Sequence, residues 1–559
     1  MKKPALFLLG ILLSFAAHAQ SEHYAKPAFP YRATAEEQQL LKSWFRNTGT
    51  TTPPPGPINA LAEFQPMGGV MIAYPLGIPV SLVAELSMVT QVKVLVYPAS
   101  DSNTVSTYFA ASGVNMGNVG FWVINHDSYW TRDYGPWFII DGSHEMGVVD
   151  FTYNRPQRPH DDAVLEQVTT LMSLNRYEMP VVHTGGNYMT DGYGTAASTT
   201  LLLEENPNLS ASSIESLAND YLGVNTYMLL DDPLGDYIEH IDCWGKFLSV
   251  DKVLIGQVPA SDSRYNDYEA VANAFSNALT PWGNPYKVYR VYTPGGWNRI
   301  TPFTNSLILN DHVFVPVSGT QWDNAAISVY QQAMPGYTIV PIMQSSYPPW
   351  ENTDALHCRT HELADPGMLY IKHFPILGEV DLPSATTLNA EITALSGQGL
   401  VDDSLLVYYR INGGEWQNTP LRVTCGGGSF EGSIPGLRAH DEVEYYLFAK
   451  DNSGRRERHP YIGAADPHRF TVNSVGVEEQ VTPNTIALYP NPCASQFVVN
   501  CPRTTRSVEV FNLAGKPVFS TSARDSRLVI HTSDWAPGVY IVKITDKDGH
   551  VFHRKMVRK

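Results

Sequence analysis

From Phe64 onward, short apolar runs alternate with stretches of helical periodicity, and this pattern predicts strands interleaved with helices. Several runs form pairs separated by a two-residue turn, which is typical of hairpins. The clearest hairpins are predicted over 246–258 and 306–317, and helices over 214–222 and 268–279. This part of the chain is therefore expected to be an α/β domain.

Polar clusters interrupt the apolar background at similar intervals. They are Trp130–Pro136, His183–Asn187, Glu239–Trp244, Thr304–Ser306 and Thr353–Thr360. Successive intervals are 54, 53, 65 and 53 residues, counted from Asp133 through Asn187, His240 and Asn305 to Cys358. Units of this length predict radial repetition, in which each unit brings one polar cluster to a shared centre. A first unit would begin near residues 63–66, but no polar cluster is evident in it.

The remainder of the chain divides into segments that differ in their pattern of apolar and polar residues. Residues 367–474 read as short alternating strands separated by turns, which predicts an antiparallel, immunoglobulin-like β-sandwich. Residues 475–486 form a polar linker, and 487–559 predict a small C-terminal β-sandwich. The α/β domain is placed at 57–366, preceded by a polar leader over 20–56.

The first nineteen residues have the composition of a secretory signal. Two lysines precede an apolar run over 5–17, and Ala17-His18-Ala19 provides a cleavage site before Gln20. No later stretch approaches the roughly 18 uninterrupted apolar residues of a membrane-spanning helix. We expect an exported chain without a transmembrane segment.

Charge and cysteine content narrow the function further. The 559 residues carry a formal charge of -17, which disfavours a nucleic-acid partner and suits cationic ligands. Five cysteines leave at least one thiol unpaired. Cys493 and Cys501 could pair across a hairpin. Of the three cysteines that would remain, Cys358 has the most polar neighbours in the sequence. A buried, inert thiol is the alternative interpretation of Cys358.

A nucleophilic thiol needs a partner that removes its proton or stabilises its charge. His240 is the best candidate. On an extended strand, His240 and Asp242 would share a face, with Cys243 on the other. A metal site or a solvated strand edge is the alternative, although the spacing disfavours zinc. Asp133 and Asp242 together suggest a clamp for a planar guanidinium.

Other side chains near these clusters bear on the substrate. Arg155 and Arg158 could bind a carboxylate, which would favour arginine at the C-terminus of a peptide. Exposed loop charges are the alternative interpretation of this pair. The aliphatic stem of the arginine would lie against Trp130, Tyr237 and Ile238, unless these side chains are simply core.

The motifs Trp-x-Arg-Asp-x-Gly, Gly-Gly-Asn, Glu-His-x-Asp, Thr-Asn-Ser and His-Cys, in this order, resemble the guanidino-group-modifying superfamily. The closest similarity is to its agmatine deiminase and secreted bacterial peptidylarginine deiminase branch. The resemblance covers about 60–366 and implies a five-bladed α/β propeller with the active site on its pseudo-fivefold axis.

The same resemblance implies the roles of individual residues. Cys358 would be the nucleophile, forming a covalent thiouronium, and His240 the general acid and base. Asp133 and Asp242 would anchor the guanidinium, while Asn305 assists the thiol. The resemblance implies no metal and no organic cofactor. It implies deimination of peptidyl-arginine, preferentially at a C-terminal arginine. A deiminase of agmatine or free arginine, an amidinotransferase, or a non-enzymatic surface adhesin remain the alternatives.

The last segment resembles the C-terminal sorting domain that the type IX secretion system recognises. The resemblance rests on Tyr489–Pro492, Leu513–Lys516 and Pro537–Val542. It implies that the secretion machinery is a partner. The protein would then be secreted or attached to the outer-membrane surface.

Overall fold

A computed structural model of the chain describes residues 23–24, 34–41, 51–235, 238–295, 300–381, 387–424, 428–473, 486–500, 505–522, 527–547 and 551–559. The chain separates into two compact units, Met1–Ser474 and Val475–Lys559. The expected signal peptide and Tyr237 lie outside the described residues. Of the leader, residues 23–24, 34–41 and 51–56 are described, and they include helix α2 (Ala35–Leu41).

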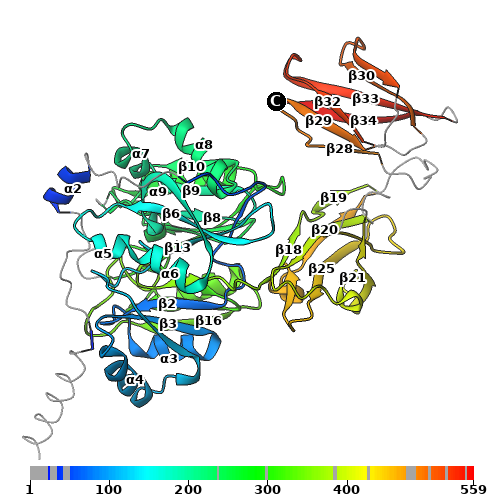
Figure 1. The fold of residues 1–559 in the computed structure, drawn as a ribbon. Coiled ribbons are helices and arrows are strands. Elements are labelled where there is room, and N and C mark those ends of the chain that lie inside the picture. The colour runs from blue at the N-terminus through cyan, green and yellow to red at the C-terminus, as the bar shows by residue number, and fades with distance from the viewer. Residues whose placement is uncertain are drawn as a thin grey trace, which may run out of the picture. The chain divides into compact units, whose positions relative to one another are not determined.

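Five small sheets form the mixed α/β part of the first unit (Figure 1). The first sheet orders β17 (His361–Leu363), β2 (Gly69–Ala73), β3 (Gln91–Val96) and β4 (Val119–Val123), and the second orders β1 (Asn59–Ala60), β5 (Trp137–Ile140), β6 (Met146–Tyr153) and β7 (Asn175–His183). The third sheet orders β10 (Thr226–Leu230), β9 (Thr195–Thr199) and β8 (Met189–Thr190). The fourth orders β11 (Gly245–Ser249), β12 (Lys252–Gln257) and β13 (Lys287–Tyr292), and the fifth orders β14 (Leu307–Leu309), β15 (His312–Val317) and β16 (Thr338–Met343).

Each sheet repeats one local plan. An antiparallel pair is followed by a helical crossover to a parallel strand, as between β12 and β13. The crossover helices are α3 (Val80–Val89), α4 (Asp101–Ala111), α5 (Pro159–Asp162), α6 (Val164–Met172), α7 (Leu201–Glu205), α8 (Ala211–Leu222), α9 (Tyr265–Asn277) and α10 (Asp323–Ala333). Both predicted hairpins and both predicted helices are therefore confirmed.

The first sheet is completed by the end of the α/β region. Strand β17 pairs antiparallel with β2, so His361 lies opposite Met71 although 290 positions separate them. The antiparallel strand that opens every other sheet is thus supplied here from residues 361–363. The polar cluster that the first unit lacked in the sequence is Thr353–Thr360, which leads into β17.

Local sequence explains why these elements form. All five residues of β2 and all eight of β6 are buried, as expected for strands covered on both faces. Helix α8 begins after Ser210, whose side chain accepts a hydrogen bond from the backbone N–H of Ser213. It ends at Gly223, which takes the left-handed conformation with φ 68° that glycine adopts without steric cost.

Two further sheets follow in residues 369–472. The first orders β18 (Leu369–His373), β20 (Thr387–Ala394), β24 (Ser429–Ser433) and β23 (Arg422–Val423). The second orders β19 (Gly378–Val380), β27 (His468–Val472), β25 (Glu442–Lys450), β21 (Leu406–Ile411) and β22 (Gln417–Pro420), with β26 (Arg456–His459) on β25. Alternate residues of both sheets share one buried core, for example Ile371, Val407 and Tyr445.

The second unit has its own core and two sheets. One contains β28 (Ala487–Tyr489), β29 (Gln496–Asn500) and β32 (Arg527–His531). The other contains β31 (Pro517–Ser522), β30 (Thr505–Asn512), β33 (Gly538–Asp546) and β34 (Val551–Arg558). Cys493 is a buried free thiol in contact with Met556, and Cys501, its possible disulfide partner, lies outside the described residues. Every helix of the described residues is too short or too polar to cross a membrane.

Candidate active site

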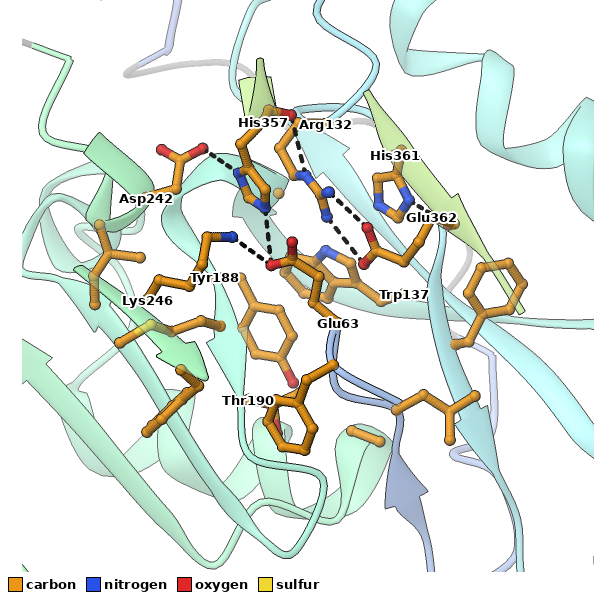
Figure 2. Close-up of a pocket in the computed structure, with 18 of the residues that line it drawn as sticks. Glu63, Arg132, Trp137, Tyr188, Thr190, Asp242, Lys246, His357, His361 and Glu362 are labelled. Carbon is orange, nitrogen blue, oxygen red and sulfur yellow. Dashed lines mark hydrogen bonds and ion pairs between the residues drawn. The ribbon is translucent and has the colours of Figure 1, made fainter. Parts of the chain in front are cut away.

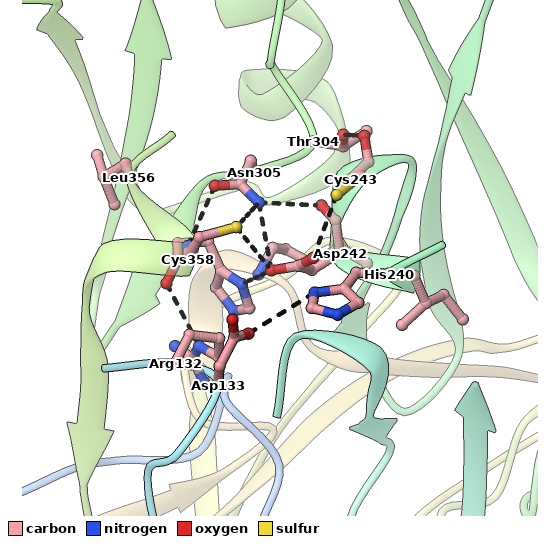
Figure 3. A network of polar contacts seen from close by, with 12 residues as sticks. Arg132, Asp133, His240, Asp242, Cys243, Thr304, Asn305, Leu356 and Cys358 are labelled. Atoms are coloured by element: carbon pink, nitrogen blue, oxygen red, sulfur yellow. Dashed lines mark hydrogen bonds and ion pairs between the residues drawn. The ribbon is translucent and has the colours of Figure 1, made fainter. Parts of the chain in front are cut away.

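The five polar clusters lie where the chain enters the first strand of each sheet. Three of them form single 3-10 turns: η2 (Gly185–Asn187) before β8, η3 (Ile241–Cys243) before β11, and η4 (His357–Arg359) before β17. The other two, around Asp133 and Asn305, precede β5 and β14. Such turns hold their backbone and side chains in fixed positions. The clusters contact one another there, although up to 225 positions separate them in the sequence (Figure 3).

The thiol of Cys358 lies at the centre of this meeting point. Its Sγ accepts a hydrogen bond from Nδ2 of Asn305 at 3.1 Å and lies 3.4 Å from Oδ2 of Asp242. A hydrogen bond from Cys243 favours the thiolate, but burial and the nearby carboxylates, that of Asp242 foremost, outweigh it and raise the pKa of Cys358 to about 12. The thiol is therefore protonated at neutral pH in the absence of a cation.

Asn305 contacts the Cys358 thiol and the loop that carries it through both ends of its amide. Its Oδ1 accepts the backbone N–H groups of Ala355 and Cys358, at 3.1 and 3.2 Å. Its Nδ2 also lies 3.2 Å from Oδ2 of Asp242. One buried amide thereby positions the loop that carries the thiol and the carboxylate beside it.

Asp133, His240 and Asp242 converge on the α-carbon of Gly186, which no side chain separates from them. A Cβ added to Gly186 would lie 2.7 Å from Oδ1 of Asp133, 2.7 Å from Nδ1 of His240 and 3.4 Å from Oδ1 of Asp242. Nδ1 of His240 is 3.6 Å from Oδ1 of Asp133. Neither that Oδ1 nor Nε2 of His240 makes a hydrogen bond within the described residues, although both are buried. Buried polar atoms without partners indicate a place where a polar ligand binds.

Burial sets the protonation of two of these groups. Loss of solvation and the charge of Asp242 raise the pKa of Asp133 to about 7. Loss of solvation lowers the pKa of His240 to about 4, with the charge of Asp242 opposing it. The imidazole is therefore neutral at pH 7, and Asp133 changes charge in the physiological range.

Asp242 differs because a chain of buried charges supports it (Figure 2). Burial by itself would raise its pKa, but the hydrogen bond and charge of His357 hold the pKa of Asp242 below its ordinary value. Nδ1 of His357 lies 2.7 Å from Oδ2 of Asp242, and its Nε2 lies 3.2 Å from Oε2 of Glu63. Lys246 donates to the same oxygen of Glu63.

Sequence reasoning missed three of these contributors: Glu63, His357 and Gly186. His357 and Gly186 lie inside two of the predicted polar clusters, but the chemical roles were assigned to other residues of those clusters. Glu63 begins the unit that lacked a polar cluster. Its separation from His357 by 294 positions left no local signal, except that a glutamate in an apolar segment usually has a buried partner.

Glu239–Asp242 is not an extended strand, which corrects the expectation from the sequence. Glu239 has a φ of 49°, and Ile241–Cys243 forms η3. The turn brings Cys243 to the same side as Asp242, with Sγ 3.6 Å from its Oδ1. Among the described residues Arg132 pairs with Glu362, to both of whose oxygens it donates at 3.0 and 2.6 Å, and not with the neighbouring Asp133.

Arg155 and Arg158 approach the same site from the loop after β6. Both are buried, and each lies close enough to Asp133 to lower its pKa. The guanidinium of Arg158 lies 5.0 Å from the ring centre of Trp130. Ile238 is buried in the neighbouring apolar core, and Tyr237 lies outside the described residues. The loop charges are therefore not solvated, contrary to the simpler interpretation of the sequence.

No cluster of metal-binding type, with three or more His, Cys, Asp or Glu suitably arranged, occurs in the part of the chain that the structure describes. Carboxylate, imidazole and thiol groups instead converge in a mainly anionic cluster. Paired carboxylates are the groups that bind a planar cation such as a guanidinium.

Comparison with known proteins agrees with this geometry. The family described as Porphyromonas-type peptidyl-arginine deiminase matches residues 78–363, and the secretion system C-terminal sorting domain matches residues 487–559. A putative agmatine deiminase of Yersinia pseudotuberculosis is 28% identical over 271 residues, which cover 42% of this chain and 74% of the relative. A putative agmatine deiminase of Vibrio parahaemolyticus is 25% identical over 346 residues, or 52% and 93%.

Among solved structures, one described as a putative agmatine deiminase aligns with a TM-score of 0.50 at 19% identity. The alignment covers 56% of this chain and 99% of that one. At this identity the likeness supports the mixed α/β fold alone. The sorting domain marks the protein as secreted or surface-attached, and it makes the secretion machinery a partner.

Proposed function

The chain belongs to the Porphyromonas-type peptidyl-arginine deiminase family and is a guanidino-modifying deiminase, a hydrolase acting on C–N bonds; from this premise we propose that it converts peptidyl-arginine to peptidyl-citrulline and ammonia, preferentially at a C-terminal arginine. The observation that carries the proposal is the convergence of side chains at Gly186. Two carboxylates and a neutral imidazole meet there, and the Cys358 thiol lies 3.4 Å from Oδ2 of Asp242, which is the set of groups that a guanidinium substrate requires.

We infer that the architecture around this site is a five-bladed α/β propeller. Five sheets of one plan support this, together with the pairing of β17 and β2 that would close the ring. The five polar clusters would then lie at the ends of the blades nearest the axis. The sheets of residues 369–472 would form an immunoglobulin-like sandwich within the expected domain 367–474.

Arrival of the substrate changes the protonation described above. A guanidinium between Asp133 and Asp242 adds positive charge beside Cys358, so the pKa values of Asp133 and the thiol both fall. The neutral His240 then accepts the proton that the thiol releases. Substrate binding and formation of the nucleophile are in this way coupled.

The reaction proceeds in two displacements. Sγ of Cys358 bonds to the central guanidinium carbon, and the tetrahedral intermediate collapses as one nitrogen leaves as ammonia with a proton from His240. Water then adds to the thiouronium carbon while His240 accepts a proton, the C–S bond breaks, and the hydroxyl of the product loses its proton to leave the ureido group. His240 returns its proton to the Cys358 thiolate, so that one guanidinium and one water become one ureido group and one ammonium ion, with no redox change. The steps use only side chains of the protein.

The preference for a C-terminal arginine rests on Arg155 and Arg158. Two buried guanidinium groups beside the pocket would meet the carboxylate of a terminal arginine, whereas agmatine has no carboxylate. Agmatine deimination is the alternative that the named relatives favour. The buried arginines favour a substrate that carries a carboxylate over agmatine, which carries none.

One experiment separates these substrates. Purified full-length protein is given matched peptides with an internal, a C-terminal or an amidated C-terminal arginine, and separately agmatine; ammonia and the ureido product are measured. We expect the C-terminal arginine peptide to have the highest kcat/KM, and Arg155→Ala to remove the preference. Equal rates on all three peptides, or faster turnover of agmatine, would refute the specificity. A Cys358→Ala variant tests whether any activity is enzymatic rather than contaminating.

A further inference from the structure

The leader contributes one residue to the neighbourhood of the active site. Glu37 of helix α2 is fully buried, whereas Glu36 beside it is exposed. Its Oε2 accepts a hydrogen bond from the backbone N–H of Thr34 at 2.8 Å. Thr34 in turn accepts from the N–H of Glu37, at 3.1 Å. These reciprocal bonds fix the side chain relative to the start of the helix.

The second oxygen of Glu37 points to a cation of the site. Oε1 lies 3.8 Å from Nε of Arg158, and both side chains are at most 1% exposed. Oε1 makes no hydrogen bond within the described residues, so the attraction to Arg158 is its principal polar interaction there. Burial of a carboxylate is costly unless a cation lies nearby. The position of this helix therefore depends on the guanidinium that it meets.

Two observations link Arg158 to the proposed substrate site. Its guanidinium lies 5.0 Å from the ring centre of Trp130, and its charge lowers the pKa of Asp133, the proposed anchor of the substrate. A carboxylate at Arg158 would thus lie where the terminal carboxylate of the substrate is expected. Two carboxylates at one guanidinium repel each other, so the carboxylate of the leader would weaken binding of the substrate carboxylate.

We propose that the leader helix is an internal ligand of the enzyme, in which the carboxylate of Glu37 occupies the Arg158 end of the pocket and competes with the C-terminal carboxylate of a peptide substrate. The inference rests on the proposed function, since it assigns the occupant of the same pocket. Displacement or removal of the leader then raises the affinity for substrate. No covalent step is involved.

The test compares full-length wild type with Glu37→Gln and, as matched control, Glu36→Gln on the exposed side of the same helix. We expect Glu37→Gln to lower KM for a C-terminal arginine peptide roughly tenfold, the scale of one lost charge-assisted contact, with kcat unchanged. Glu36→Gln should match the wild type. A synthetic peptide of residues 31–45 should inhibit the Glu37→Gln protein competitively, and the same peptide with glutamine at position 37 should not.

Binding provides a second readout that does not depend on turnover. In a Cys358→Ala background, calorimetry should show tighter binding of the arginine peptide when residue 37 is glutamine. If ammonia is released but neither KM nor affinity responds to Glu37→Gln, the internal ligand is refuted and the proposed function stands. If no variant releases ammonia from any peptide, the proposed function fails, and the calorimetric comparison alone decides on the leader. Absence of peptide binding to either protein would overturn both.

Discussion

Replacement of Gly186 by alanine is the sharpest test of the proposed site. The new methyl carbon would lie 2.7 Å from both Asp133 and His240, whereas ordinary contacts begin near 3.4 Å. The two side chains must therefore separate from it by about 0.7 Å, the difference of these distances. Misplacement by about 1 Å costs on the order of 10²-fold in rate. We expect kcat/KM to fall about 100-fold, equivalent to about 2.7 kcal/mol of transition-state stabilisation.

The assay measures ammonia release from a C-terminal arginine peptide, with thermal unfolding to confirm that the variant folds. Gly117→Ala serves as control, because its Cβ would meet only the side chain of Asn115, at 3.3 Å, outside the site. The φ angle of Gly186 is not positive, so alanine can take its place without straining the backbone. Activity of Gly186→Ala within threefold of the wild type would show that no substrate atom occupies this position.

Three further outcomes follow from the electrostatics. Because the pKa of Asp133 is raised to about 7, its ionised fraction rises from about 0.1 at pH 6 to about 0.9 at pH 8. The KM for a cationic substrate should therefore fall about tenfold over that interval. A constant KM would contradict the role of Asp133 as an anchor of the substrate. With a thiol pKa of about 12, Cys358 should react with iodoacetamide at pH 8 about a thousandfold more slowly than a free cysteine, and its rate should still be rising at pH 10; a plateau below pH 9 would exclude the raised pKa. Glu362→Gln should lower the free energy of unfolding in urea by about 3–5 kcal/mol, because it leaves Arg132 buried without its carboxylate. The control Glu269→Gln, in a more exposed pair, should cost about 1 kcal/mol or less.

The sequence alone could locate the chemistry because polar residues are conspicuous in an apolar, strand-rich region. Cys358, Asp242 and Asn305 were each expected in the site, and the structure brings them into direct contact. The similar intervals between the clusters predict a repeated structural unit, and such a repeat can bring the clusters together. The two hairpins likewise follow from local alternation and turn residues, which act over a few positions.

What could not be predicted depends on contacts between distant segments. Alternation in Glu239–Asp242 fits a strand, and only packing of the turn against η2 and β9 favours η3 instead. The pairing of β17 with β2 supplies the missing cluster of the first unit, and no local pattern encodes it. The ion pair between Glu37 and Arg158 could not be predicted either. In a short polar leader, the sequence does not distinguish the buried face of a helix from the exposed one.

In the proposed site, the selectivity for a cation follows from the different protonation of the two carboxylates. Asp133 and Asp242 are both buried and repel each other, so the resting site does not readily hold both in the ionised form. The hydrogen bond from His357, itself supported by Glu63, keeps the charge on Asp242 alone. Asp133 then becomes fully ionised when a cation enters. A neutral ligand supplies no such compensation, and it would leave the thiol beside an anion, protonated and unreactive. The low reactivity of the resting thiol and the preference for a guanidinium thus have one physical cause.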